Sequence, residues 1–304
     1  MIPKRKLLVT GANGFVAGSV LAQAGSDWEV HAVSRSSAPA NIKQLSWHTL
    51  DLLKSGAWEE LFEYVRPDAI IHTAGAADID FCQANPNIAR NLNVELTERL
   101  AQSCSSLGTR LIFCSTDTVF DGEHAPYKEE SLPLPVNVYA ETKIEAERRV
   151  AALGNRGVVA RLSLVMGLAV LGAGNSFLAR MLTSLSQSKK VGAPETEFRT
   201  PIDVLTLGAA LLELAGGTFH GIFHLAGLTK VSRFELNRAI ASRFGFPLEL
   251  IFSQSPAAGR APRPRDVCLD VTKARNALKT PLLTLNEGLS LIIENRHSAG
   301  VSFT

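Results

Sequence analysis

The sequence predicts an α/β protein, in which a doubly wound parallel sheet is accompanied by a smaller C-terminal lobe. Short apolar segments alternate with amphipathic helical segments through the first half of the chain. A glycine-rich turn joins the first apolar segment to the first helical one, and the alternation loosens after about residue 161. Such alternation is typical of βαβ units, whose strands pair in parallel.

The expected elements of the first half follow one another in this order. Strands are predicted at 6–10, 28–33, 69–74, 110–115 and 157–162. Helices are predicted near 15–24, 56–65, 89–107 and 139–153. The stretch 87–104 carries apolar residues at spacings of three and four, so we expect these helices to cover the faces of the sheet.

The second half is predicted to be mixed. A helix at 201–215 and a strand at 221–227 would complete the main sheet, whereas 167–176 and 254–266 are expected to be loops. The predicted division assigns 1–162, with about 201–228, to the main domain and 163–200 with 229–304 to the smaller lobe.

Composition excludes several classes of function. The chain has 304 residues, 46% of them hydrophobic, and a net charge of +2 with no basic stripe. Neither nucleic-acid binding nor a disordered charged tail is therefore predicted. The most apolar later stretch, 162–174, is too short and too glycine-rich to span a bilayer, which needs about 20 residues. The N-terminus lacks the cleavage site of a signal peptide, so no membrane association is expected.

Cysteine and histidine spacing predicts no metal site. The four cysteines show no CxxC pattern and no cluster with histidine, which argues against structural zinc and a disulfide framework. Reduced thiols indicate a cytoplasmic location. His220 and His224 fall on a short predicted strand and are expected to be structural.

The segment VTGANGFVAG, residues 9–18, follows the first strand and opens the first helix. Gly11 would permit the tight turn, and Gly14 would let the backbone approach a pyrophosphate at the helix N-terminus, where free N–H groups favour an anion. Ala17 is small enough for helix and strand to pack closely. This context predicts a Rossmann dinucleotide-binding site.

The end of the second strand favours NADP(H) over NAD(H). NAD sites usually carry an acidic residue about 20 positions after the glycines, whereas this chain has Ser34, Arg35 and Ser36, which suit a 2′-phosphate. Asp51 and Leu52 are expected beside the adenine. The full set of predicted cofactor residues is Gly11, Asn13, Gly14, Phe15, Val16, Ser34, Arg35, Ser36, Asp51, Leu52, Ala74, Gly75, Ala76, Asn93, Tyr139 and Lys143.

A tyrosine and a lysine stand four residues apart in VYAETK, residues 138–143, so Tyr139 and Lys143 would share one helical face. A nearby cation lowers the pKa of a phenol, which is about 10 when free, by stabilising the phenolate. Thr116, at the end of a predicted strand, can hydrogen-bond a carbonyl oxygen. With these three residues the sequence resembles the extended short-chain dehydrogenase/reductase superfamily, which implies catalytic roles for Thr116, Tyr139 and Lys143.

Further motifs resemble the dTDP-4-dehydrorhamnose reductase family along nearly the whole chain. They are STDTVFDGEHAPYKEE, PLPVNVYAETKIEAE, GAGNSF, FRTPIDV, GIFHLAG, VSRFELNRAI and RPRDVCLDVTKA. The resemblance implies NADPH-dependent reduction of the 4-keto group of a nucleotide-linked 6-deoxy sugar held by the C-terminal lobe. Asp117, Asn175 and Arg263 are the predicted substrate-binding residues, with Arg265 as a further candidate for the diphosphate. Alternatively, Arg263 and Arg265 pin a proline-rich loop.

Two related chemistries are disfavoured by the loop after the fifth strand. Sugar nucleotide dehydratases resemble TDE there, whereas this chain has TDT, and Thr118 cannot act as a base. The reductase family often has a tyrosine at this position, so Thr118 is also a departure from that family. GDP-fucose synthases place a cysteine in the loop, and Cys114 lies before the required position.

A second interpretation comes from another class of protein. The chain also resembles the regulatory β subunit of methionine adenosyltransferase, including QSPAAGRAPRPRD and the tail KTPLLTLNEGLSLIIENR. That resemblance implies a non-catalytic NADP-binding subunit whose tail, from about residue 294, inserts into a partner. The complete triad favours an enzyme. A homodimer is expected only because symmetric dimers are the commonest assemblies.

Overall fold

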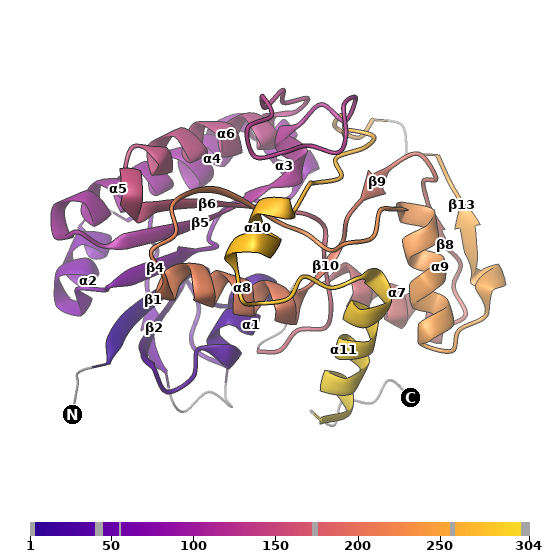
Figure 1. The fold of residues 1–304 in the computed structure, drawn as a ribbon, viewed down its shortest axis with the longest axis horizontal. Coiled ribbons are helices and arrows are strands. Elements are labelled where there is room, and N and C mark those ends of the chain that lie inside the picture. The colour runs from indigo at the N-terminus through magenta and orange to yellow at the C-terminus, as the bar shows by residue number, and fades with distance from the viewer. Residues whose placement is uncertain (1–3, 40–44, 55, 172–175, 256–258, 299–304) are drawn as a thin grey trace.

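The computed structural model describes residues 4–39, 45–54, 56–171, 176–255 and 259–298. Its centre is a seven-stranded parallel sheet in the order β11-β6-β5-β4-β1-β2-β3 (Figure 1). The strands are β1 Arg5–Thr10, β2 Trp28–Ser34, β3 Ser46–Thr49, β4 Ala69–His72, β5 Arg110–Thr116, β6 Gly157–Leu162 and β11 Gly221–Leu225. The strand order reverses between β1 and β4, and the carboxyl ends of strands at such a switch point form the usual ligand crevice of this architecture. The predicted doubly wound α/β fold is confirmed.

Helices cover both faces of the sheet. The principal ones are α1 Phe15–Gln23, α2 Ala57–Val65, α5 Leu96–Leu107, α6 Val138–Ala151 and α8 Val204–Gly216. Neighbouring residues of β1 enter different apolar clusters: Leu7 packs with α1 and α8, and Leu8 packs with α2, α5 and α6. Burial on both faces explains why the strands read as continuous apolar runs.

The predicted helix near 89–107 is not one regular helix. It comprises α4 Pro86–Arg90, a π-helical turn at Asn91–Glu95, and α5. β4 ends at His72, earlier than the predicted strand, and a short helix, α3 Ile79–Ala84, follows it. A π-helical turn shifts the side chains around it, and such turns are frequent at functional sites.

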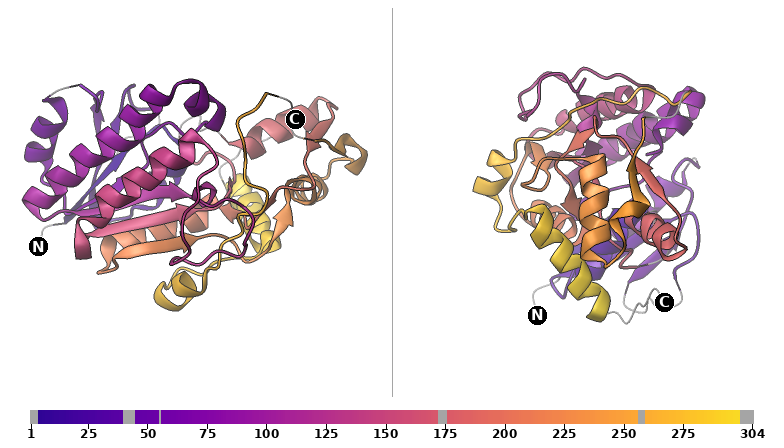
Figure 2. Two further views of the ribbon diagram at one scale, coloured as in Figure 1. Left: turned by 90° about the horizontal axis from the view of Figure 1, so that it is seen from above. Right: turned by 90° about the vertical axis from the view of Figure 1, so that its right-hand side faces the viewer.

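The smaller lobe is built from helices and short two-stranded sheets (Figures 1 and 2). Its elements are β7 Val165–Met166, α7 Phe177–Ser186, β8 Val191–Ala193, β9 Phe198–Arg199, β10 Ile202–Asp203, β12 Val231–Ser232, α9 Arg233–Arg243, β13 Ile251–Ser253 and α11 Leu285–Ser298. β7 pairs with β10, β9 with β12 and β8 with β13. A separate apolar cluster of α7, α9 and α11 side chains fills its interior.

One late segment of the chain packs against the main sheet. α10, Thr272–Ala277, lies beside β11, and Ala274 and Leu278 belong to the apolar cluster that also contains Leu7. The strap 259–266, which precedes it, runs from the lobe to the sheet half (Figure 1). The division into 1–162 with 201–228 and 163–200 with 229–304 stays a prediction.

Candidate active site

The glycine loop connects β1 to α1 as the sequence predicts. Gly11 has φ of +70°, a conformation that L side chains rarely adopt. A Cβ at Gly11 would lie 2.8 Å from the Ala74 backbone nitrogen, so glycine is needed for space as well as for conformation. The Gly14 N–H donates to the Gly11 carbonyl at 2.7 Å, and α1 starts at the next residue. The N-terminus of α1 therefore faces the switch point of the sheet.

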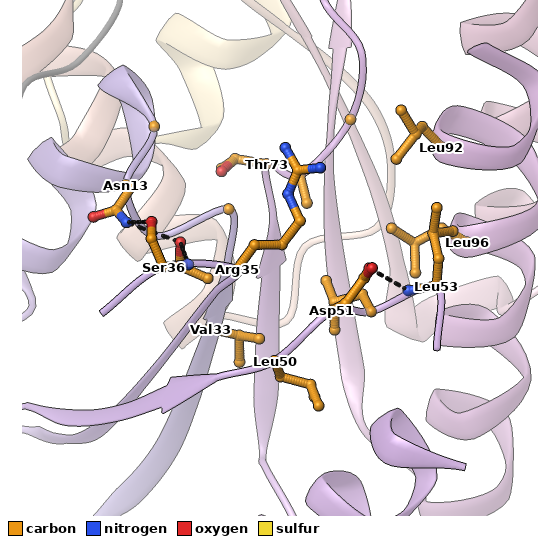
Figure 3. A pocket seen from close by; sticks show the side chains of 16 residues that line it. Asn13, Val33, Arg35, Ser36, Leu50, Asp51, Leu53, Thr73, Leu92 and Leu96 are labelled. Atoms are coloured by element: carbon orange, nitrogen blue, oxygen red, sulfur yellow. Dashed lines mark hydrogen bonds between the residues drawn. The ribbon is translucent and has the colours of Figure 1, made fainter. Parts of the chain in front are cut away.

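A pocket of about 320 Å³ lies where β1, β2, β3 and β4 end (Figure 3). The predicted cofactor residues that line it are Gly11, Asn13, Gly14, Ser34, Arg35, Ser36, Asp51, Leu52, Ala74 and Gly75. Phe15, Val16, Ala76, Asn93, Tyr139 and Lys143 do not line this pocket. Sequence reasoning missed the apolar wall formed by Val33, Leu50, Leu53, Leu92 and Leu96, together with Thr73. Apolar strand ends and helix residues are too common for a motif to identify them.

Polar groups at the rim of this pocket are organised by Asn13. Its side-chain amide donates to the hydroxyls of Ser34, at 2.9 Å, and Ser36, at 2.6 Å. The exposed Arg35 side chain extends over the pocket between these serines and the opposite wall (Figure 3). Asp51 accepts a hydrogen bond from the Leu53 N–H at 3.0 Å. No carboxylate follows directly on β2, so the rim is suited to an anionic group.

A network of buried hydrogen bonds begins at Thr10, the last residue of β1 before the glycine loop. Thr10 Oγ1 lies 2.7 Å from His72 Nδ1, and His72 Nε2 lies 3.1 Å from Thr97 Oγ1. Thr97 gives its hydroxyl proton to the Asn93 carbonyl at 2.7 Å, so it must accept from His72. This assigns the Nε2–H tautomer to a neutral His72. Burial, followed by the charge of Lys143, lowers the pKa of His72 to about 3.

Asn93 extends this hydrogen-bond network to α6, the helix that carries Tyr139. Its side chain accepts from the Ala76 N–H at 2.8 Å and donates to Thr142 Oγ1 at 2.9 Å. Asn93 lies in the π-helical turn and is buried. It therefore links the loop at Ala76 to α6.

The structure brings Thr116, Tyr139 and Lys143 to one place, between the end of β5 and the first turns of α6. Lys143 is buried, and its ammonium donates to the Cys114 carbonyl at 2.6 Å and lies 4.0 Å from the centre of the Phe113 ring. Asn137 caps α6 by accepting from the Ala140 N–H at 2.9 Å. The cap fixes where the helix begins, and with it the direction of Tyr139.

The electrostatics of this cluster differ from the expectation. Burial raises the pKa of the Tyr139 phenol above its ordinary value, and a hydrogen bond with the Thr116 side chain only partly opposes this. Burial also lowers the pKa of Lys143 to about 8. The predicted lowering of the phenol pKa by Lys143 is thus wrong for this structure, because the cost of burying the phenolate is the largest cause of the shift. The phenol stays protonated at neutral pH.

Asp117 lies next to this cluster but is buried among protein groups. It accepts a hydrogen bond from the Ser163 hydroxyl at 3.0 Å, and its carboxylate lies 3.8 Å from Arg199 Nε. Burial raises the pKa of Asp117. A predicted substrate ligand is therefore already held by two neighbours, and it links Thr116 to the smaller lobe.

Arg263 forms an ion pair instead of presenting a free guanidinium. Its two terminal nitrogens lie 3.0 and 2.8 Å from the carboxylate oxygens of Asp80, which also accepts from the Ala261 N–H at 2.9 Å. Arg263 holds the pKa of Asp80 well below its usual range. Asn137 donates to the Pro262 carbonyl at 2.9 Å. The strap 259–266 is thus pinned to the sheet half, as the alternative reading of the proline-rich loop predicts.

The structure gives less information on the other two predicted substrate residues, Arg265 and Asn175. The Arg265 carbonyl accepts from the Phe198 N–H at 2.7 Å. Asn175 lies outside the described residues. Within the part of the chain that the structure describes, no group of three or more acidic, histidine or cysteine side chains could hold a metal. No helix in those same ranges is long and apolar enough to cross a membrane.

The sheet order, the glycine loop at the switch point and the polar cluster on α6 together define a Rossmann-type α/β protein. The chain belongs to the family described as RmlD substrate binding domain, whose model matches residues 5–298. This confirms the family that the sequence motifs indicate.

Curated relatives of two kinds are similar to this chain. Methionine adenosyltransferase 2 subunit beta of Pongo abelii is 31% identical, with 90% of this chain and 82% of that protein covered. The dTDP-4-dehydrorhamnose reductase of Mycobacterium tuberculosis is 30% identical, with 86% of this chain and 82% of that protein covered. The two resemblances noted in the sequence are therefore both found at nearly equal identity.

Solved structures agree with the architecture. A hypothetical dTDP-4-dehydrorhamnose reductase from Sulfolobus tokodaii superposes with a TM-score of 0.82 at 30% identity, covering 92% of this chain and 98% of that one. The dTDP-4-dehydrorhamnose reductase of Bacillus anthracis in complex with NADP has a TM-score of 0.86 at 22% identity, covering 96% of this chain and all of the other. The latter similarity concerns the fold alone.

Proposed function

We propose that this protein is an NADPH-dependent reductase that acts on the 4-keto group of a nucleotide-linked 6-deoxy sugar. The observation that carries the proposal is the convergence of Thr116, Tyr139 and Lys143 at the end of β5. The glycine loop and the pocket at the switch point lie in the same sheet half. Membership of a family that includes dTDP-4-dehydrorhamnose reductases supports the substrate class.

A nicotinamide dinucleotide fits the residues present. Gly11 and Gly14 leave the backbone free to approach a pyrophosphate, and the pocket wall beside Asp51 and Leu52 would take the adenine. When bound, the reduced nicotinamide supplies hydride to the carbonyl carbon. The protein's part is proton transfer and positioning.

Tyr139 is the proposed proton donor to the carbonyl oxygen. Its raised pKa keeps the phenol protonated, which is the form that ketone reduction consumes. Thr116, which is hydrogen-bonded with Tyr139, would hold the same oxygen as negative charge develops. Lys143 would orient the nicotinamide ribose, a role implied by the family resemblance.

The reaction can be tested directly with the purified protein. NADPH is mixed with 4-keto-6-deoxy sugars linked to dTDP, UDP or GDP, and the loss of nicotinamide absorbance is followed. Oxidation that depends on one of these sugars is the expected result. Tight NADPH binding without oxidation by any of them would contradict the proposal.

A preference for NADP(H) is part of the proposal. Arg35 and Ser36, at the rim of the pocket, would hold the 2′-phosphate. We expect Arg35→Ala to weaken NADPH binding by about tenfold or more, through loss of a charge-assisted contact, with little effect on NADH. Titrations of both cofactors measure this. Equal losses for the two would show that Arg35 does not select the phosphate.

A second function is supported by the similarity to methionine adenosyltransferase 2 subunit beta over 90% of the chain. In that case the protein would bind NADP(H) as a non-catalytic partner of a methionine adenosyltransferase. Co-purification with such an enzyme, together with no NADPH oxidation by any of the 4-keto sugars, would favour this second function. A cytoplasmic location is proposed for either function, since all four cysteines are free thiols.

A further inference from the structure

Arg233 occupies an unfavourable position for a cation. It is the first residue of α9, directly after the N-cap Ser232, whose side chain forms a capping box with Glu235. The N-terminus of a helix carries partial positive charge, so anions are favoured there and cations are disfavoured. The capping box shows that this helix end is otherwise well formed.

The guanidinium of Arg233 is also incompletely paired. Its Nη1 atom is buried and has no hydrogen-bond partner. The guanidinium carbon lies 4.8 Å from the centre of the Phe177 ring, a contact that uses none of the group's donors. A buried donor without a partner costs free energy and calls for an explanation.

Other arginines surround the same place. Burial lowers the pKa of Arg233 to about 10, and the charges of Arg199 and Arg260 act in the same direction. Glu197 and Asp117 oppose this effect. The carboxylate of Asp117 already faces Arg199 and accepts from Ser163, and Arg260 Nε lies 3.6 Å from the carboxylate of Asp80. Arg199 and Arg260 therefore each have an acidic neighbour.

The position of Arg233 connects it with the reactive cluster. Its backbone N–H donates to the Glu197 carbonyl at 2.9 Å, and β12, which precedes it, pairs with β9. β9 carries Arg199, the neighbour of Asp117, and Asp117 directly follows Thr116. Arg233 therefore belongs to the side of the smaller lobe that adjoins the catalytic candidates.

We propose that Arg233 binds the diphosphate of the nucleotide sugar. This inference rests on the proposed function and adds a substrate residue to it. The diphosphate would accept the hydrogen bond that Nη1 lacks and would bring negative charge to this buried cation. Arg263, the sequence candidate for this role, is committed to Asp80.

Inorganic pyrophosphate is the probe for this site, because its binding does not depend on turnover or on the base. The full-length protein, saturated with NADPH, is titrated calorimetrically with pyrophosphate. We expect binding to the wild type, and about tenfold to hundredfold weaker binding by Arg233→Met. Arg238→Met, which removes an exposed arginine from the same helix, is the matched control and should bind pyrophosphate as the wild type does.

Thermal unfolding distinguishes a binding role from a structural one. Since Arg233→Met removes a buried unpaired donor, its melting temperature without pyrophosphate should equal or exceed that of the wild type. Should this variant fail to fold, Arg233→Lys, which keeps the charge but lacks Nη1, should still bind several-fold more weakly. Pyrophosphate affinity that is unchanged in the tested variant, or absent in the wild type, would overturn the inference.

The result is separable from that of the sugar panel. Turnover of a 4-keto sugar without any effect of Arg233→Met on its KM would retain the reductase and overturn the role of Arg233. Pyrophosphate binding that depends on Arg233, without turnover of any sugar, would retain the anion site and contradict the reductase.

Discussion

The hydrogen-bond network beside the glycine loop and the start of α9 treat their buried polar groups differently, although Arg156 Nε and His224 Nε2 are also buried without a partner in the sheet half. In the sheet half, the buried network from Thr10 through His72 and Thr97 to Asn93 gives each of these side chains a hydrogen-bond partner. In the lobe, Arg233 keeps a buried donor without a partner. A fully paired network holds one geometry, whereas an unpaired cation is stabilised by an incoming anion. The comparison indicates a rigid frame around this network in the sheet half and a recognition surface at the start of α9.

The strongest way to break this comparison is to remove the proposed acid from the frame. Tyr139→Phe should lower turnover in the 4-keto sugar assay by about 10²–10⁴, because the phenyl ring cannot donate a proton. NADPH affinity, measured by fluorescence titration, should change little. Turnover close to that of the wild type, with the cofactor still bound, would remove Tyr139 from the mechanism.

The frame can next be tested through a buried ion pair. Arg161 is almost completely buried, and its guanidinium lies 2.8 Å from the carboxylate of Glu147, which also accepts from Ser115. Glu147→Ala leaves the cation unpaired, so we expect a loss of about 3–5 kcal/mol in the free energy of unfolding by urea.

A variant on the same helix serves as the control for that measurement. Glu145 is only partly buried and pairs with the exposed Arg90, so Glu145→Ala should have little effect. Equal losses in the two variants would show that burial of the Glu147 pair is not what matters.

The pH dependence of stability sharpens the comparison further. His72 and His224 both have a folded-state pKa lowered to about 3, with burial as the largest cause. The unfolded chain takes up protons near pH 6.5 that these histidines cannot bind when folded. Stability is therefore fully present above about pH 6.5 and is lost as the pH falls toward 3, by up to about 1.4 kcal/mol per pH unit for each histidine.

Urea unfolding at several pH values between about 7.5 and about 4.5, a range that brackets the ordinary histidine pKa, measures this slope. His72→Asn should make it shallower, whereas His220→Asn, at an exposed position, should leave it unchanged. A slope that is the same in His72→Asn as in the wild type would contradict a neutral, buried His72.

The smallest effect is expected at the strap between the two regions. Asp80→Asn removes the ion pair with Arg263, so the strap should open more often and trypsin should cleave after Arg260 about twofold to fivefold faster. High salt should bring the wild type toward the variant, because it screens this partly exposed pair. Unchanged cleavage would mean that the hydrogen bond from Asn137 to Pro262 is sufficient to hold the strap.

Most of the frame could be read from the sequence because its signals are local. Gly11 predicts a turn with positive φ, and apolar runs predict strands buried on both faces. Tyr139 and Lys143 lie on one helical face because of their spacing. Thr10, His72 and Thr97 gave no such signal, since hydrogen bonds between residues far apart in the chain depend on strand order.

The sequence alone determined the parallel α/β fold, the glycine loop and the residues that meet at the end of β5, since turn geometry and helical or strand periodicity are properties of neighbouring residues. Only the tertiary structure decided the direction of the Tyr139 pKa shift, the commitment of Arg263 to Asp80 and the unpaired donor of Arg233. These depend on burial and on distances between remote segments. Desolvation, which is set by the whole fold, is the largest cause of the Tyr139 pKa shift.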